Sequence, residues 1–213
     1  VGYYSVLMGD WVGPTGTVLA VEAERFNYLT LLVNLERVPA QGGACHAAAS
    51  SDDSERTMTL YQNHSGDHTL EATSSGAGDA TISRVTGSGR VTGWQKRTGE
   101  VVTLRQVKTQ RLDDLVDQNI GPDARVDFVK IDVEGHERSV WLGMPRLLQR
   151  NPQVQIAAEW TPGHDPHCEL GAMAEASGFK LHEVHTDGML RPTTLGALCA
   201  LPPTDWRMLW FRR

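Results

Sequence analysis

The sequence predicts an α/β domain with a mixed, mostly parallel sheet and helices on both faces. Apolar runs of strand length alternate with segments of helical periodicity along most of the chain, which is the pattern that βα units produce. Several of the apolar runs end in a carboxylate residue. The 213 residues are 40% hydrophobic and 22% charged, as in ordinary soluble globular proteins, and they suit one domain over residues 1–213 with a substantial core.

Residues 127–137 organise this prediction. Residues 128–131 form an apolar run bounded by acids, which predicts a short buried strand that ends at the Gly135 turn. Helical spacing follows at Val140, Trp141, Met144, Leu147 and Leu148. The ionisable residues Asp132, Glu134, His136 and Glu137 therefore cluster at the carboxyl end of a strand. Open α/β sheets bind ligands there, although the same acids could serve only to cap the helix.

The bulk properties exclude several classes of function. The net charge of -6 argues against nonspecific nucleic-acid binding, which needs a basic face. No apolar run approaches the roughly 20 residues that span a bilayer, and no signal peptide is recognisable. The three cysteines, Cys45, Cys168 and Cys199, are widely spaced. They predict free thiols in a reducing compartment, and hence a cytoplasmic protein.

The first third of the chain predicts a nucleoside site. Residues 1–11 are expected to form a helix, and residues 17–22 a buried strand that ends at Glu22. An acid at such a strand end can accept both hydroxyls of a ribose, in a dehydrogenase as well as in other enzymes. Residues 25–35 predict a helix and residues 44–49 a weak strand. Ser51 and Asp52 then offer a hydroxyl and a carboxylate that could read an adenine amine, or could form only a polar turn.

The middle of the chain is the least informative. Residues 58–61 and 100–107 predict strands, and a helix follows near residue 112. The histidines of residues 63–68 suggest a solvated loop more than a metal site. Residues 72–99 are rich in Gly, Ser and Thr and lack the apolar content for a second core. We therefore interpret residues 62–107 as an insertion or flap.

The last third predicts further strand and helix pairs. Pro145 should kink or restart the helix after the Gly135 turn. Residues 154–160 form the next strand and carry Glu159 near its end. Asp165 or His167 is expected to cap a helix over residues 170–176. Strands follow over residues 179–185 and 206–211, joined by a loop that includes residues 197–201.

Residues 130–137, with Trp141-Leu142-Gly143 after them, resemble the signature of FkbM-type methyltransferases, which use S-adenosylmethionine (SAM). Residues 49–52 and 109–115 extend the resemblance over most of the chain. It implies a Rossmann-like class I fold whose last strand inserts antiparallel. It also implies that Glu22 contacts the SAM ribose, that Ser51 and Asp52 lie beside the adenine, and that Gly2 belongs to the cofactor loop. By the same comparison the chain is a fragment that begins inside this loop, without the preceding central strand and glycine-rich segment.

Methyl transfer to an oxygen needs a group that takes the hydroxyl proton. Asp132 is the acid best placed near the sulfonium of SAM, and His136 is the expected general base because its unperturbed pKa is about 6.5. Glu159 is expected to orient the substrate or the base. We assign no metal, and expect a hydroxyl on a small molecule, sugar or natural product as the acceptor. The alternatives are a nicotinamide-dependent oxidoreductase, which also explains Glu22, and a non-catalytic module with the same fold.

Overall fold

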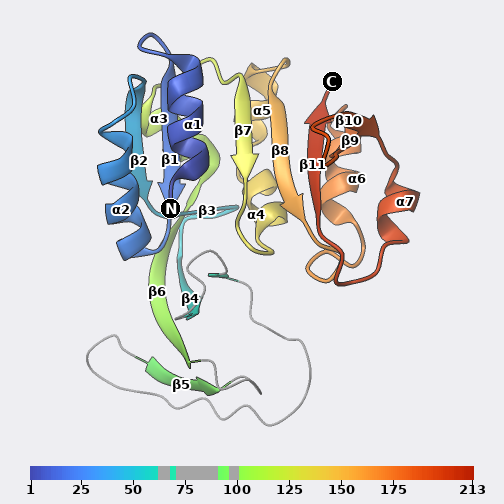
Figure 1. Ribbon diagram of the computed structural model, residues 1–213, viewed down its shortest axis with the longest axis horizontal. Coiled ribbons are helices and arrows are strands. Elements are labelled where there is room, and N and C mark those ends of the chain that lie inside the picture. The colour runs from blue at the N-terminus through green and yellow to red at the C-terminus, as the bar shows by residue number, and fades with distance from the viewer. Residues whose placement is uncertain (62–67, 71–90, 96–100) are drawn as a thin grey trace. The chain divides into compact units, whose positions relative to one another are not determined.

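A computed structural model describes residues 1–61, 68–70, 91–95 and 101–213 (Figure 1). The chain divides into two compact units, Val1–Ala124 and Arg125–Arg213. Both units combine helices with strands, so the predicted α/β class is confirmed. The single domain over residues 1–213 stays a prediction.

The first unit opens with two pairs of a helix followed by a strand. Its elements are α1 (Tyr3–Val12), β1 (Thr17–Glu22), α2 (Arg25–Leu35) and β2 (Gln41–His46). Strands β1 and β2 pair in parallel, with Glu22 opposite His46 at their carboxyl ends. The structure confirms the predicted strand and reproduces the predicted bounds of α2. The buried residues Ala20 on β1 and Leu31 on α2 belong to the core of this unit.

A second sheet in the first unit contains β3 (Ala48–Ser50), β4 (Glu55–Tyr61), β5 (Val91–Gln95) and β6 (Val101–Arg111), and α3 (Leu112–Asn119) follows it. Strand β3 runs parallel to the far end of β6, whereas β4 and β5 pair with β6 in the antiparallel sense. In Figure 1, β6 is the long green strand that connects these pairings. The predicted strands near residues 58–61 and 100–107 are confirmed. Most of the histidine loop and of the segment 72–99 lies outside the described residues.

The second unit contains one five-stranded sheet in the order β10-β9-β11-β8-β7. Its elements are β7 (Phe128–Ile131), α4 (Glu137–Leu142), α5 (Pro145–Arg150), β8 (Gln155–Trp160), α6 (Glu169–Ala176), β9 (Lys180–Val184), β10 (Leu190–Pro192), α7 (Leu195–Cys199) and β11 (Arg207–Arg212). Strands β7 and β8 are parallel, and β11 is antiparallel to both β8 and β9. The last strand therefore inserts antiparallel between two strands that share one direction (Figure 1).

The sheets are more mixed than the sequence predicts. Parallel pairing is found between β1 and β2, β3 and β6, and β7 and β8, while all other named pairs are antiparallel. Two causes account for the difference. First, β11 inserts between β8 and β9, so one possible parallel strand pair is replaced by two antiparallel pairs. Second, β4 and β5 pair with β6 in the antiparallel sense, which an alternation of strands and helices in the sequence does not predict.

Apolar residues at the predicted spacing build the core of the second unit. Ile156, Leu209 and Phe211 are fully buried on the sheet, and the Trp141 ring lies 5.5 Å from the rings of Phe179 and Phe211. The expected effect of the proline is confirmed, because α4 ends at Leu142 and α5 begins with Pro145. In contrast, the expected loop at residues 197–201 is partly the helix α7, whose first turn Thr194 caps by accepting a hydrogen bond from the Ala197 N–H.

The structure corrects the expectation of three free thiols. Cys168 and Cys199 are joined in a disulfide, and only Cys45 is free. The two residues are 31 positions apart, and their Cα atoms come within 5.9 Å because the start of α6 and the end of α7 meet in the fold. Wide sequence spacing therefore does not prevent pairing. Within the described part of the chain, no helix is both long enough and apolar enough to cross a membrane.

Asp165 caps α6, as predicted, and supports a stability prediction. Its carboxylate accepts hydrogen bonds from the backbone N–H groups of Glu169 at 2.8 Å and Leu170 at 3.0 Å, and from Trp160 Nε1 at 2.9 Å. We expect Asp165→Ala to lower the free energy of unfolding by about 1–2 kcal/mol, because it removes a helix cap and leaves the buried indole N–H unpaired. Urea denaturation would measure the loss. Asp165→Asn keeps an acceptor oxygen and should lose less; equal stability of all three chains would contradict the prediction.

Candidate functional site

Two carboxylates lie at the carboxyl end of β1 in the first unit. Glu22 is the last residue of the strand, and its Oε1 accepts a hydrogen bond of 2.7 Å from the Glu24 N–H. Burial raises the pKa of Glu22, and the negative charge of Glu24 raises it further, while backbone hydrogen bonds from Glu24 and Ala23 oppose the shift. A carboxylate offers about four lone-pair sites. Glu22 therefore retains capacity to accept hydrogen bonds from a ligand.

Glu24 is a candidate site residue that the sequence does not predict. Its Oε2 caps α2 by accepting from the Asn27 N–H at 2.8 Å. The side chain is only 4% exposed, and its Oε1 has no hydrogen-bond partner among the described residues. A buried acceptor without a donor costs free energy, and a ligand hydroxyl would satisfy it. The local signal was the position of Glu24 directly before a helical segment, but glutamate is not a preferred N-cap residue.

Gly2 begins α1 with a left-handed backbone, at φ 77°. A Cβ atom at this position would lie 2.8 Å from Leu31 Cδ1 on α2. Both the backbone conformation and the close approach therefore favour glycine. The proposed role of Gly2 in cofactor binding stays a prediction.

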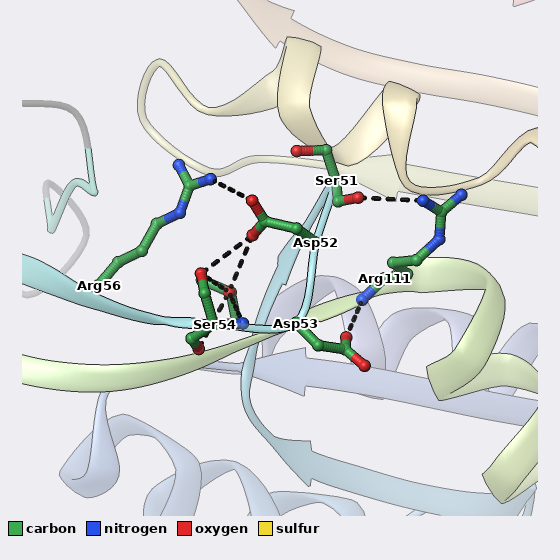
Figure 2. A network of polar contacts seen from close by, with 7 residues as sticks. Ser51, Asp52, Asp53, Ser54, Arg56 and Arg111 are labelled. Carbon is green, nitrogen blue, oxygen red and sulfur yellow. Dashed lines mark hydrogen bonds and ion pairs between the residues drawn. The ribbon is translucent and has the colours of Figure 1, made fainter.

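Figure 2 shows the loop of residues 51–53, which follows β3 in the first unit. Asp52 is bound through both carboxylate oxygens. Its Oδ2 lies 2.9 Å from Arg56 Nη2, and its Oδ1 accepts from Ser54 Oγ at 3.0 Å and from Thr109 Oγ1 at 3.3 Å. The hydrogen bonds from Arg56 and Ser54 lower the pKa of Asp52. The lowered pKa favours the ionised carboxylate, which accepts hydrogen bonds.

Arg111, at the end of β6, binds the two residues on either side of Asp52. Its Nη1 donates to the Ser51 carbonyl at 3.1 Å, and its backbone N–H donates to Asp53 Oδ1 at 3.1 Å (Figure 2). The Ser51 hydroxyl points away from Arg111 in the same view. The structure therefore places Ser51 and Asp52 in one loop that Arg111 contacts on both sides of Asp52. The adenine contact expected of them stays a prediction.

The signature of the second unit forms a strand, a tight turn and a helix, as predicted. Glu134 and Gly135 both have left-handed backbones, at φ 49° and φ 95°. A Cβ atom on Gly135 would lie 3.1 Å from His164 Cγ, so the turn requires glycine for its conformation and its packing. The Glu137 carboxylate closes the turn by accepting from the Gly135 N–H at 3.2 Å. Burial raises the pKa of Glu137.

Three acids meet where β7 and β8 end. Asp132, Glu134 and Glu159 each present an oxygen, and these oxygens lie within 4.8 Å of one another. Burial raises the pKa of Glu159. The negative charge of Asp132, and a hydrogen bond that the protonated Glu159 carboxyl donates to Asp132, raise it further, whereas Lys130 opposes the shift. The Lys130 ammonium lies 3.1 Å from Asp132 Oδ2. The cluster could hold a divalent cation, although Lys130 already balances part of its charge.

Lys130 was not among the expected site residues. It stands two positions before Asp132, so the period of a strand places both side chains on one face. The predicted base, His136, is only 1% exposed and is the N-cap residue of α4. The structure thus brings carboxylate oxygens of Asp132 and Glu159 within 4.8 Å of each other, and encloses the His136 imidazole in protein.

The family model of the methyltransferase FkbM domain matches residues 2–185. The chain belongs to the FkbM methyltransferase family. It therefore carries a methyltransferase domain, which requires a methyl donor, and the nicotinamide-dependent oxidoreductase is not favoured. Searches of curated proteins and of solved structures each found no match. Within the FkbM domain, the matched range includes Glu22, the loop of residues 51–53, the turn of residues 132–137 and Glu159.

Proposed function

We propose that the chain is a SAM-dependent O-methyltransferase that acts on a hydroxyl of a small molecule, a sugar or a natural product. The observation that carries the proposal is the pair of carboxyl groups of Asp132 and Glu159, whose oxygens lie within 4.8 Å of each other, in a family of methyltransferases. A hydroxyl must lose its proton when it is methylated, and a carboxylate of raised pKa is a stronger base than an ordinary one. The insertion of β11 between β8 and β9 supports the Rossmann-like class I fold that such enzymes use.

The residues of the first unit fit the nucleoside part of SAM. Glu22 is a strand-end acceptor for ribose hydroxyls, and the unpartnered Oε1 of Glu24 is a second acceptor beside it. Ser51 and Asp52 offer a hydroxyl and a fixed carboxylate for the adenine. Gly2 contributes the left-handed start of α1 to the cofactor loop. When bound, SAM supplies an electrophilic methyl group on a sulfonium.

The residues of the second unit fit the transfer of the proton. Asp132 places negative charge for the sulfonium, and the Asp132–Glu159 pair accepts the proton of the substrate hydroxyl. Lys130 limits the repulsion between the two carboxylates. The burial of His136 favours a structural role at the start of α4 over the role of general base that the sequence suggests. The dependence of kcat on pH in variants of Glu159 and His136 separates the two hypotheses.

Binding and turnover test the proposal directly. The full chain should bind SAM and S-adenosylhomocysteine saturably in calorimetry and should bind NADH no better than background. Incubation with SAM that carries a labelled methyl group and a panel of sugars, phenols and aliphatic alcohols should transfer the label to oxygen. A chain that binds neither nucleoside and transfers no label would disprove the proposal. A chain that binds SAM without transfer to any acceptor class would instead support the non-catalytic alternative.

A further inference from the structure

Arg111 belongs to the ligand-binding edge of the sheet in the first unit. Strands β3 and β6 are parallel, and Ser50 and Arg111 face each other at their last paired position. The loop of residues 51–53 leaves β3 at this point, and α3 begins directly after Arg111. Parallel α/β sheets bind ligands outside the carboxyl ends of their strands. Arg111 is therefore anchored next to the loop that is proposed to contact the adenine.

Arg111 is fixed from more than one side. Its guanidinium donates to the Ser51 carbonyl, and its backbone N–H donates to the Asp53 carboxylate. Its Nη2 also lies 3.9 Å from Asp113 Oδ2, and the Asp113 side chain is fully buried. Movement of Arg111 away from Asp113 would leave a buried carboxylate without this ion pair, which costs free energy. The Ser51 carbonyl is consequently held in one direction.

The direction of the Ser51 carbonyl determines where the next N–H group points. A trans peptide is planar, so the carbonyl of one residue and the N–H of the next point to opposite sides, and the described chain has no cis peptide bond. The Asp52 N–H therefore points away from the Arg111 guanidinium. Among the described residues, no backbone carbonyl accepts a hydrogen bond from it. Arg56, Ser54 and Thr109 fix the Asp52 carboxylate independently (Figure 2).

We propose that Arg111 is a positioning residue that makes the site selective for adenine. By holding the Ser51 carbonyl, it presents the Asp52 N–H as a donor beside the Asp52 carboxylate as an acceptor. Adenine offers the complementary pair, because its N1 is an acceptor and its exocyclic amine is a donor. Hypoxanthine offers the reverse, with a donor at N1 and an acceptor at O6. This inference rests on the proposed function, since it assigns the base of the proposed cofactor to this loop.

Two nucleoside ligands test the inference on the full chain. Calorimetry with S-adenosylhomocysteine and S-inosylhomocysteine gives the preference of each variant for adenine. We expect Arg111→Ala to lower the affinity for S-adenosylhomocysteine about tenfold, the equivalent of one net hydrogen bond. The affinity for S-inosylhomocysteine should not change. Arg111→Lys should restore part of the preference, because its ammonium can donate to the same carbonyl. Arg191→Ala, which removes an exposed arginine paired with Asp187 in the second unit, is the matched control and should bind like the wild type.

The outcomes separate this inference from the proposed function. A wild-type chain that binds neither ligand would overturn the proposed function and the inference with it. A wild-type chain that binds S-adenosylhomocysteine, together with an Arg111→Ala variant that keeps the wild-type ratio of affinities, would overturn the inference alone. An equal loss of affinity for both ligands would also overturn the inference, because it indicates that Arg111 has a structural role only. If thermal melting shows that Arg111→Ala does not fold, Arg111→Met replaces it, because methionine keeps the aliphatic stem without the donor. The ratio of its affinities for the two ligands then tests the inference.

Discussion

Glu159→Gln is expected to lower kcat by roughly 10²–10⁴, the usual contribution of a general base. Glutamine keeps the size of the side chain and can still hydrogen-bond Asp132, but it cannot take the proton of a substrate hydroxyl. The affinity for SAM should change little, because the proposed nucleoside contacts lie on other residues. Methyl transfer under saturating SAM measures kcat, and calorimetry measures the affinity.

The dependence of kcat on pH identifies which group accepts the proton. Burial and Asp132 raise the pKa of Glu159, and only its ionised form is a base. The rate should therefore rise with pH through the raised pKa of Glu159, and Glu159→Gln should abolish that rise. His136→Ala is the control, and it should retain the rise with near-normal turnover. If His136→Ala loses the rise and Glu159→Gln keeps it, the base is His136, as the sequence suggests.

Unfolding experiments give an independent check on Glu159. Because its pKa is raised in the folded chain, the folded chain binds more protons than the unfolded chain between the ordinary pKa and the raised one. The stability that this proton provides is therefore present at low pH and is lost as the pH rises through that window. Glu159→Gln lacks this dependence. The difference between the unfolding free energies of the variant and the wild type should accordingly shift in favour of the variant as pH rises. A difference that is constant with pH would contradict the raised pKa.

Glu22→Ala is expected to weaken SAM binding by about 1.5–3 kcal/mol, the scale of hydrogen bonds to a charged group. The carboxylate at the end of β1 is the proposed acceptor for the ribose hydroxyls, and alanine leaves those hydroxyls without a partner. Calorimetry on the full chain measures the loss. Glu36→Ala, directly after the last residue of α2, removes an exposed acid outside the proposed site and should bind SAM normally.

The raised pKa of Glu22 adds a signature that a general loss of stability would not produce. Burial is its main cause, and Glu24 contributes. The affinity for SAM should increase with pH through this raised pKa, because the ionised carboxylate accepts hydrogen bonds from both hydroxyls more strongly than the neutral acid. Glu22→Gln should bind SAM with an affinity that does not follow this titration. Unchanged SAM affinity in Glu22→Ala would remove Glu22 from the site.

Local pattern in the sequence was sufficient for several elements. Glycine at position 135 with an apolar run before it and helical spacing after it predicts the strand, turn and helix of the signature, and the structure contains them. The bounds of α2 and the restart of the helix at Pro145 also follow from local periodicity and proline geometry. These features depend on residues within a few positions of one another, where backbone sterics and side-chain period act directly. The position of Glu22 at a strand end is of the same kind.

The polar contacts of the candidate site were decided by the tertiary structure. Arg111 reaches Ser51 across 60 positions of sequence, and Cys168 meets Cys199 across 31. The pairing of Glu159 with Asp132 requires that β7 and β8 be parallel neighbours, so that their carboxyl ends coincide. The burial of Glu24 and His136 likewise depends on packing that periodicity does not specify. Proton affinity depends on burial and on nearby charge, so the residue that can act as a base becomes known only when the fold brings distant side chains together.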